Sequence, residues 1–380
     1  MTFFRGLLVA AAAAILTTAG LWWLQHWAIQ SGQGTGSDLV ERRLASASLS
    51  GQNVLLPAQV DEATLRWCLA EEIQAPPQIA MLGSSHTLQL SSADCKPYRL
   101  SNFSLSGGFM QDHLVTTEIL DRRGKRPRVW VLMVDSWFFD YEMDFRQWRT
   151  RPHELAAMEA KLSELEQPPL APIFRNRVAD ELRPRSQASL SLSPILSMAD
   201  NFVRQHTHVI VPADVEDALG TVLTSDGAIK AAGNHSDISV AEARSIALHQ
   251  YSVNRDRHRY GIYPKVDDQL WALFERWVQF LKADGAQVVL VLSPYHPAIY
   301  GKMTADPKSQ LKAVETRVRR YAPAAGVRLV GSYDPNVVGV GEADFFDGDH
   351  LREEGLRTLL GTSLVDAAKD AGLAPPADVK

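Results

Sequence analysis

Five short apolar segments, each bounded by turn-forming residues, constrain the fold of this 380-residue chain more than any other feature of its sequence. Each has the length and the residue types of a buried β-strand; the segments are Gln78–Leu82, Arg99–Phe103, Val129–Val134, Val288–Leu292 and Val327–Val330. Helical patterns lie between several of them, and from Val266 to Leu281 the apolar residues recur at helical spacing before Gly285. This alternation predicts an α/β fold in which helices cover both faces of a parallel sheet.

The connection between the third and fourth predicted strands, residues 137–264, is far longer than an ordinary crossover. Segments within it, such as Glu154–Leu165, have a helical pattern, so we predict a long helical insertion near the functional site. We therefore expect one α/β domain over residues 77–372. A membrane anchor at 1–27 and a tether and lead-in at 28–76, flexible over Ser31–Ser37, would precede it, and a tail at 373–380 would follow it.

Two polar motifs together predict nucleophilic catalysis. Gly83-Ser84-Ser85-His86-Thr87 follows the first predicted strand, and Asp347-Gly348-Asp349-His350 precedes the final helical segment. An aspartate three residues before a histidine can hold the imidazole in one tautomer, so that its far nitrogen takes the proton of a serine. The pair predicts a serine esterase or acyltransferase. Ser84 is the alternative nucleophile; no zinc-type Cys/His spacing occurs, and we predict neither a metal ion nor a cofactor.

A third block, Asn102-Phe103-Ser104-Leu105-Ser106-Gly107, follows the second predicted strand. In order and in placement at strand ends, the three blocks resemble those of the SGNH, or GDSL-type, hydrolase superfamily. The resemblance covers about residues 78–135 and the chain from Val288 onward, and it implies a flavodoxin-like sandwich. It also implies that Ser85 is the nucleophile, that His350 is the base and Asp347 its orienter, and that the amides of Ser85 and Gly107 form an oxyanion hole.

One block departs from the family pattern. The family normally has Gly-x-Asn-Asp after the third strand, with the Asn side chain donating to the oxyanion, whereas this chain reads Val134-Asp135-Ser136. Either the oxyanion hole has two backbone donors only, or Ser136 or a residue of the insertion supplies the third. Loss of one such donor costs roughly a hundred- to a thousandfold in rate, which argues against a strong hydrolase, leaves a slower transferase open and slightly favours an inactive site.

Further polar residues are candidates for substrate binding because ligands of parallel sheets bind beyond the carboxyl ends of the strands; they are His86, Asn102, Asp135, Ser136, Tyr295 and His296. His86 is expected to position other groups, and His296 either donates to a substrate oxygen or makes a structural hydrogen bond. Asp349 is expected to face solvent or to cap the final helix. The charged segment Asn254–Tyr260 predicts either a solvated loop or a contact with an anionic or sugar ligand.

The first residues predict where this chemistry takes place. No charge interrupts the apolar run from Leu7 to Leu24, Arg5 precedes it, and its far end is rich in tryptophan. We predict a bacterial-type, single-pass inner-membrane protein whose catalytic domain lies in the periplasm or outside the cell. A signal peptide cleaved near Thr17–Ala19 is the alternative.

The composition and one loop of the sequence indicate which classes of molecule the protein binds. The net charge of −5 and the lack of a dense Lys/Arg run speak against nucleic acid. The loop Pro294-Tyr295-His296-Pro297 resembles loops of envelope proteins related to alginate O-acetylation. That resemblance implies an acylated carbohydrate or another ester as substrate, most of all O-acetyl groups of an envelope or exported polysaccharide, and a membrane protein as acyl donor. The alternatives are an inactive scaffold of a polysaccharide complex and a lipid or thioester hydrolase with an apolar groove.

The chain has two cysteines, Cys68 and Cys95, which flank the serine motif. In an oxidising exported compartment they would form one disulfide. Two free buried thiols are the alternative, because a single pair of cysteines defines no disulfide framework.

Overall fold

The computed structural model describes residues 38–57, 60–143, 147–165, 173–182, 220–230, 237–253 and 258–375. The predicted anchor and the Gly/Ser-rich tether lie outside these ranges. Within them, no helix combines the length and the apolar character needed to cross a membrane.

A five-stranded parallel sheet forms the centre of the α/β fold, with the strand order β3-β2-β4-β7-β8. The strands are β2 (Ile79–Leu82), β3 (Leu100–Asn102), β4 (Val129–Met133), β7 (Gln287–Leu292) and β8 (Arg328–Gly331). All five strand predictions are confirmed to within two residues at each end. The register places Ile79 beside Leu100 on one side and beside Val129 on the other.

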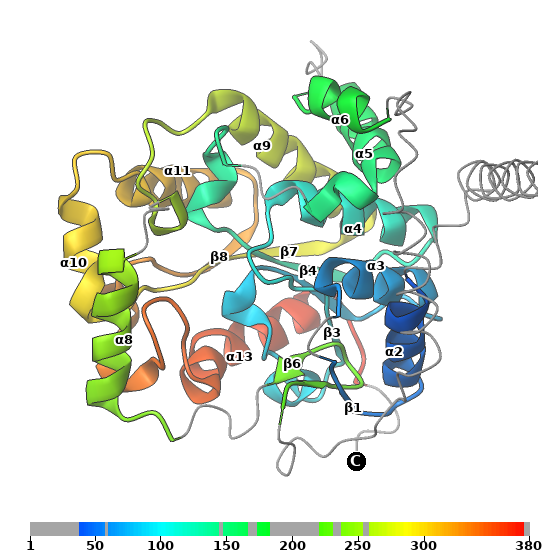
Figure 1. The fold of residues 1–380 in the computed structure, drawn as a ribbon. Helices are drawn as coiled ribbons and strands as arrows, with labels where there is room; N and C mark the ends of the chain where they lie inside the picture. Colours follow the sequence, from blue (N-terminus) through cyan, green and yellow to red (C-terminus); the bar gives the residue numbers. More distant parts are fainter. Residues whose placement is uncertain are drawn as a thin grey trace, which may run out of the picture.

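Alternate residues of each strand enter two separate cores, one on each face of the sheet. In β4, Trp130 and Leu132 belong to the first core, whereas Val129 and Val131 belong to the second. The first core is covered by α3 (Glu62–Glu72), α4 (Met110–Arg122), α9 (Asp268–Lys282) and α11 (Leu311–Ala324). The second is covered by α13 (Glu353–Asp370), which lies across the sheet from α4 and α9 (Figure 1). Because both faces are buried, the central strands β2, β4 and β7 are almost entirely apolar and do not alternate.

Helix α9 shows how the sequence determines these elements. Asp267 caps its N-terminus, where the side chain accepts hydrogen bonds from the amides of Gln269 and Leu270. Lys282 occupies the last turn, where a positive charge is favourable. The apolar stripe predicted from the sequence is buried against the sheet, with Phe274 and Trp277 fully enclosed.

A second, three-stranded antiparallel sheet joins two remote segments of the chain. It consists of β1 (Val54–Leu55), β5 (Val222–Leu223) and β6 (Ile229–Lys230) in the order β1-β5-β6. The turn before β6 contacts the main sheet, because the Asn102 amide donates to the Asp226 carbonyl at 2.8 Å. Gly227 lies so close to this strand that a Cβ atom would be 2.5 Å from the Asn102 carbonyl oxygen.

The insertion is therefore only partly helical. Its described residues form helices, as predicted, but they also contribute β5 and β6, which the sequence analysis did not predict. The other α-helices of the described residues are α2 (Leu39–Leu49), α5 (Pro152–Glu164), α6 (Arg175–Leu182), α8 (Val240–Val253), α10 (Pro297–Ala305) and α12 (Pro335–Val338). Helices α2 and α3 pack in the first core, so the folded unit begins well before residue 77.

The predicted disulfide is wrong. Cys68 and Cys95 are both free and buried. Cys68 lies in the core on one face of the sheet and Cys95 in the core on the opposite face, so the sheet separates the two thiols.

Burial raises the pKa of both thiols to about 12, because a buried thiolate loses its hydration. We therefore expect a maleimide to label neither cysteine in the native protein and both in denatured, unreduced protein. Mass spectrometry counts the adducts, and denatured protein without free thiols would contradict the structure.

Candidate active site

The three predicted blocks meet at the carboxyl edge of the parallel sheet. Ser85 begins a 3-10 turn, Ser85–Thr87, three residues after β2 ends. Gly83 makes this turn possible, because a Cβ atom there would lie 2.3 Å from Thr87 Oγ1 and 2.9 Å from Met133 Cβ. Ser84 is fully buried and its hydroxyl caps the turn by accepting from the His86 amide, so Ser85 is the serine that reaches the surface.

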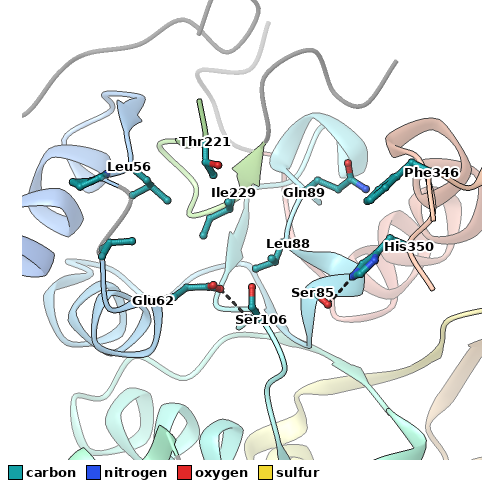
Figure 2. A pocket seen from close by; sticks show the side chains of 12 residues that line it. Leu56, Glu62, Ser85, Leu88, Gln89, Ser106, Thr221, Ile229, Phe346 and His350 are labelled. Carbon is teal, nitrogen blue, oxygen red and sulfur yellow. Dashed lines mark hydrogen bonds between the residues drawn. The ribbon is translucent and has the colours of Figure 1, made fainter. Parts of the chain in front are cut away.

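Ser85, His350 and Asp347 form a continuous hydrogen-bonded chain. Ser85 Oγ lies 2.7 Å from His350 Nε2 (Figure 2), and His350 Nδ1 lies 2.8 Å from Asp347 Oδ2. Asp347 is itself oriented by the backbone amides of His350 and Asp349, which donate to its Oδ1 at 2.8 and 3.0 Å. The ring of Phe346 stacks on the imidazole at 5.4 Å and 8°. With Nδ1–H donating to Asp347, Nε2 is left free to accept the Ser85 proton.

The charges around His350 favour its protonated form. Burial alone would lower the pKa of His350, but the carboxylates of Asp347 and Asp349 outweigh burial and raise that pKa above its ordinary value. Burial would raise the pKa of Asp347, yet the neighbouring imidazolium lowers it. The site therefore stabilises an ion pair of the kind that forms when His350 removes a proton from Ser85.

The two predicted oxyanion donors are open backbone amides. The N–H groups of Ser85 and Gly107 make no hydrogen bond to any residue that the structure describes. Gly107 adopts a positive φ of 61° in the exposed turn that follows β3, and the next amide, that of Gly108, donates back to the Leu105 carbonyl. Both amides are therefore free to donate to a developing negative charge, and Ser106, which precedes Gly107, lines the same cavity as Ser85.

The block after β4 has no asparagine, and its two polar residues, Asp135 and Ser136, are buried. The Asp135 carboxylate accepts a hydrogen bond from His86 Nδ1 at 3.0 Å, and both residues are buried. Ser136 is fully buried, and its carbonyl oxygen accepts from the Tyr263 hydroxyl at 2.7 Å. The Asp135 side chain is thus an acceptor already bound to His86.

A cavity of about 420 Å³ opens beside Ser85 and His350. About half of its wall is apolar and consists of Leu56, Pro57, Val60, Leu88, Ile229 and Phe346. Its polar side chains, besides Ser85 and His350, are Glu62, Gln89, Ser106 and Thr221. Figure 2 shows Leu56, Thr221 and Ile229 on the far side from His350, so part of the wall comes from the three-stranded sheet and the residues next to it.

The residues predicted to bind substrate are brought to the same edge of the sheet but do not line this cavity. All six are buried, with exposures of 3% or less. The Tyr295 hydroxyl donates to the Arg259 carbonyl, and His296 Nδ1 accepts from the Ala298 amide at the start of α10. The Asn102 side chain donates hydrogen bonds to the carbonyls of Thr87 and Leu90 and accepts one from the Ser104 amide. The prediction of direct substrate contact is therefore not supported for these six residues, which are buried away from the cavity.

The prediction for Asp349 is wrong. It neither faces solvent nor caps α13: it is 3% exposed and pairs with Arg259 Nη2 at 2.9 Å. Sequence reasoning also missed Glu62, which accepts from the Ser106 amide at the floor of the cavity. Asp349 lies within a recognised motif whose sequence does not show which aspartate contacts the histidine, and Glu62 lies in a helical segment with no local signal of a site.

Three side chains at the site have the composition of a metal site. Ligand atoms of His86, Asp349 and His350 all lie within 4.8 Å of one another. His350 Nδ1 is engaged by Asp347, and the guanidinium of Arg259 already neutralises Asp349. A cation would have to displace both, so the group fits an internal charge network better than a metal site.

The chain matches no protein-family model, and no curated protein is significantly similar to it.

Proposed function

We propose that this protein is a serine ester hydrolase or O-acyltransferase of the SGNH (GDSL-type) superfamily. The observation that carries the proposal is the hydrogen-bonded chain Ser85–His350–Asp347 at the edge of a ligand-sized cavity. The strand order supports a flavodoxin-like sheet, since the five strands in chain order are arranged 2-1-3-4-5.

The reaction follows from the proton positions. Ser85 Oγ attacks the ester carbonyl carbon while its proton passes to His350 Nε2, and the amides of Ser85 and Gly107 bind the resulting oxyanion. His350 then gives the proton to the leaving alkoxide oxygen as the C–O bond breaks, which leaves an acyl group on Ser85. Water or a sugar hydroxyl attacks this acyl-enzyme, its proton passes to His350, and Ser85 recovers it on release. The cycle needs no cofactor.

The proposed substrate is an acylated carbohydrate, and the leading candidate is the O-acetyl groups of an envelope or exported polysaccharide. The proposed acyl donor is a membrane protein. The polar side chains of Glu62, Gln89 and Thr221 can accept or donate hydrogen bonds to sugar hydroxyls. The apolar half of the cavity wall favours a second candidate, an ester with a longer acyl chain. The missing asparagine after β4 favours the inactive scaffold.

One set of assays separates these candidates. Purified full-length protein is incubated with acetylated carbohydrate and with p-nitrophenyl esters of increasing chain length, and a fluorophosphonate probe reports reaction at serine. Acetate release and labelling would support the proposal, and rates that increase with chain length would assign the cavity to acyl binding. A protein that neither labels nor hydrolyses any ester would leave the scaffold as the function.

We also propose that the catalytic domain lies outside the cytoplasm, because of the apolar run Leu7–Leu24 preceded by Arg5. Two reporters fused in turn after Lys380 test this location. Alkaline phosphatase, which is active only after export, should be active, whereas a fluorescent protein that matures only in the cytoplasm should be dark. Fluorescence without phosphatase activity would refute the location. N-terminal sequencing of the mature protein distinguishes an anchor from a cleaved signal.

A further inference from the structure

His350 Nδ1 has a second carboxylate beside it. Asp347 Oδ2 lies at 2.8 Å, and Asp349 Oδ1 lies at 3.3 Å from the same nitrogen. Asp349 Oδ1 is buried and has no hydrogen-bond partner among the described residues. A buried carboxylate oxygen without a partner is costly, and a small rotation of the imidazole would satisfy it. The proton on Nδ1 thus has two acceptors within reach.

Two other groups hold Asp349 in this position. Arg259, from the 3-10 turn His258–Tyr260, donates to Asp349 Oδ2 at 2.9 Å. His86 Nε2 approaches the same oxygen at 3.8 Å, and its other nitrogen is fixed by Asp135. The His86 and His350 rings lie 5.2 Å apart. Side chains from three separate segments, those of Arg259, His86 and His350, therefore converge on the Asp349 carboxylate.

We infer that Asp349 is a second positioning carboxylate for His350, held by Arg259 and by the His86–Asp135 pair, which keeps the proton on Nδ1 when the bond to Asp347 is lost. The inference rests on the proposed function and deepens it. In a triad with a single orienting aspartate, its replacement by asparagine leaves the wrong tautomer and costs roughly 10⁴-fold in rate. Here Asp349, which when ionised only accepts hydrogen bonds, still favours the productive tautomer.

The charges determine the sign of the pH effects. The titratable and charged groups around His350 and Asp349 are Asp347, His86, Asp135, Arg259 and Tyr295. His350 acts as a base only when neutral, so the reaction rate rises as pH passes its pKa. Removing a negative charge at 349 destabilises the imidazolium and lowers that pKa, whereas removing the positive charge at 259 raises it.

The first test is the pH dependence of fluorophosphonate labelling in the full chain. Asp349→Asn should move the acid limb of the profile to lower pH, and Arg259→Gln should move it to higher pH. Asp366→Asn and Arg317→Gln are matched controls, because they make the same charge changes at partly exposed sites on α13 and α11 and should leave the limb in place. Shifts of the same sign in both test variants, or no shift in either, would overturn the inference.

The second test is a double-mutant cycle on the labelling rate. Asp347→Asn should cost about 10²-fold, and Asp347→Asn/Asp349→Asn should cost about 10⁴-fold, the full loss of an orienter. A double variant no slower than Asp347→Asn would refute the second role. A merely structural role would lower the melting temperature of Asp349→Asn without moving its pH profile.

A measurement without substrate separates this inference from the proposed function. Nitrogen-15 histidine NMR, with His350 assigned by its loss in His350→Gln, follows the titration of the ring directly. If the protein reacts with no ester or probe while the ring still titrates with the expected opposite shifts, the proposed function fails and the positioning network stands. If the protein reacts with an ester or the probe but the pKa of the His350 ring does not change in either variant, the proposed function stands and the positioning role of Asp349 is refuted.

Discussion

Replacement of Ser85 by alanine is expected to reduce ester turnover roughly 10⁶-fold, and His350→Ala by a similar factor, because each removes one half of a single proton-coupled step. The double variant should be little slower than either single variant, since groups that act together are far from additive. Asp347→Asn should be less damaging than His350→Ala, because the base remains. Initial rates on the best ester found for the parent measure all four variants.

The control for this series is the folded state. Ser85 and His350 are partly exposed at strand ends and carry little core packing, so circular dichroism should find melting temperatures near that of the parent. Ser50→Ala, at the exposed end of α2, is the matched serine control and should retain full activity. An active Ser85→Ala variant would eliminate the covalent mechanism.

Replacement of Asn102 by alanine is expected to cost about 3 to 5 kcal/mol in the free energy of unfolding. The Asn102 side chain is 1% exposed; its Nδ2 donates to the carbonyls of Thr87 and Leu90 at 2.7 and 2.8 Å and to that of Leu88 at 3.2 Å. Its Oδ1 accepts from the Ser104 amide at 2.8 Å. Alanine would leave several buried backbone groups unpaired, at about 1 to 3 kcal/mol for each group that water cannot reach.

Urea denaturation of the parent and the variant measures this difference. Asn336→Ala, an exposed asparagine in α12, should change stability by less than about 0.5 kcal/mol. Asn102→Asp should be at least as harmful as alanine, because a carboxylate cannot donate to the three carbonyls. A loss below about 1 kcal/mol would show that the loops around Ser85 are held by other contacts.

The central strands β2, β4 and β7 could be predicted because they are buried on both faces, which makes each an almost continuous apolar run such as Val129–Met133. The triad could be predicted because parallel strands end at one edge, so motifs that follow different strands converge. Strand order could not be predicted, since no local pattern records which strands pair. Strands β5 and β6 were not predicted because each has only two residues, which is too short to show a periodic pattern.

The errors have a common physical origin. In Asp347-Gly348-Asp349-His350 either aspartate is close to the histidine along the chain, and only the tertiary positions of Arg259 and His86 reveal that both reach it. The cysteines flank the serine motif in sequence, yet the sheet lies between them. Proximity along the chain does not define the face of a sheet on which a side chain lies.

Ser85 and His350 are separated by 265 residues, and the cavity wall between them needs strands from both the start of the domain and the insertion. Closing so long a loop is unfavourable until the packing that it permits has formed. The nucleophile therefore acquires its base only when almost the whole domain has folded. In a chain cut or stalled before the last helix, Ser85 would lack its completed surroundings, so the proposed reaction would begin only in the assembled domain.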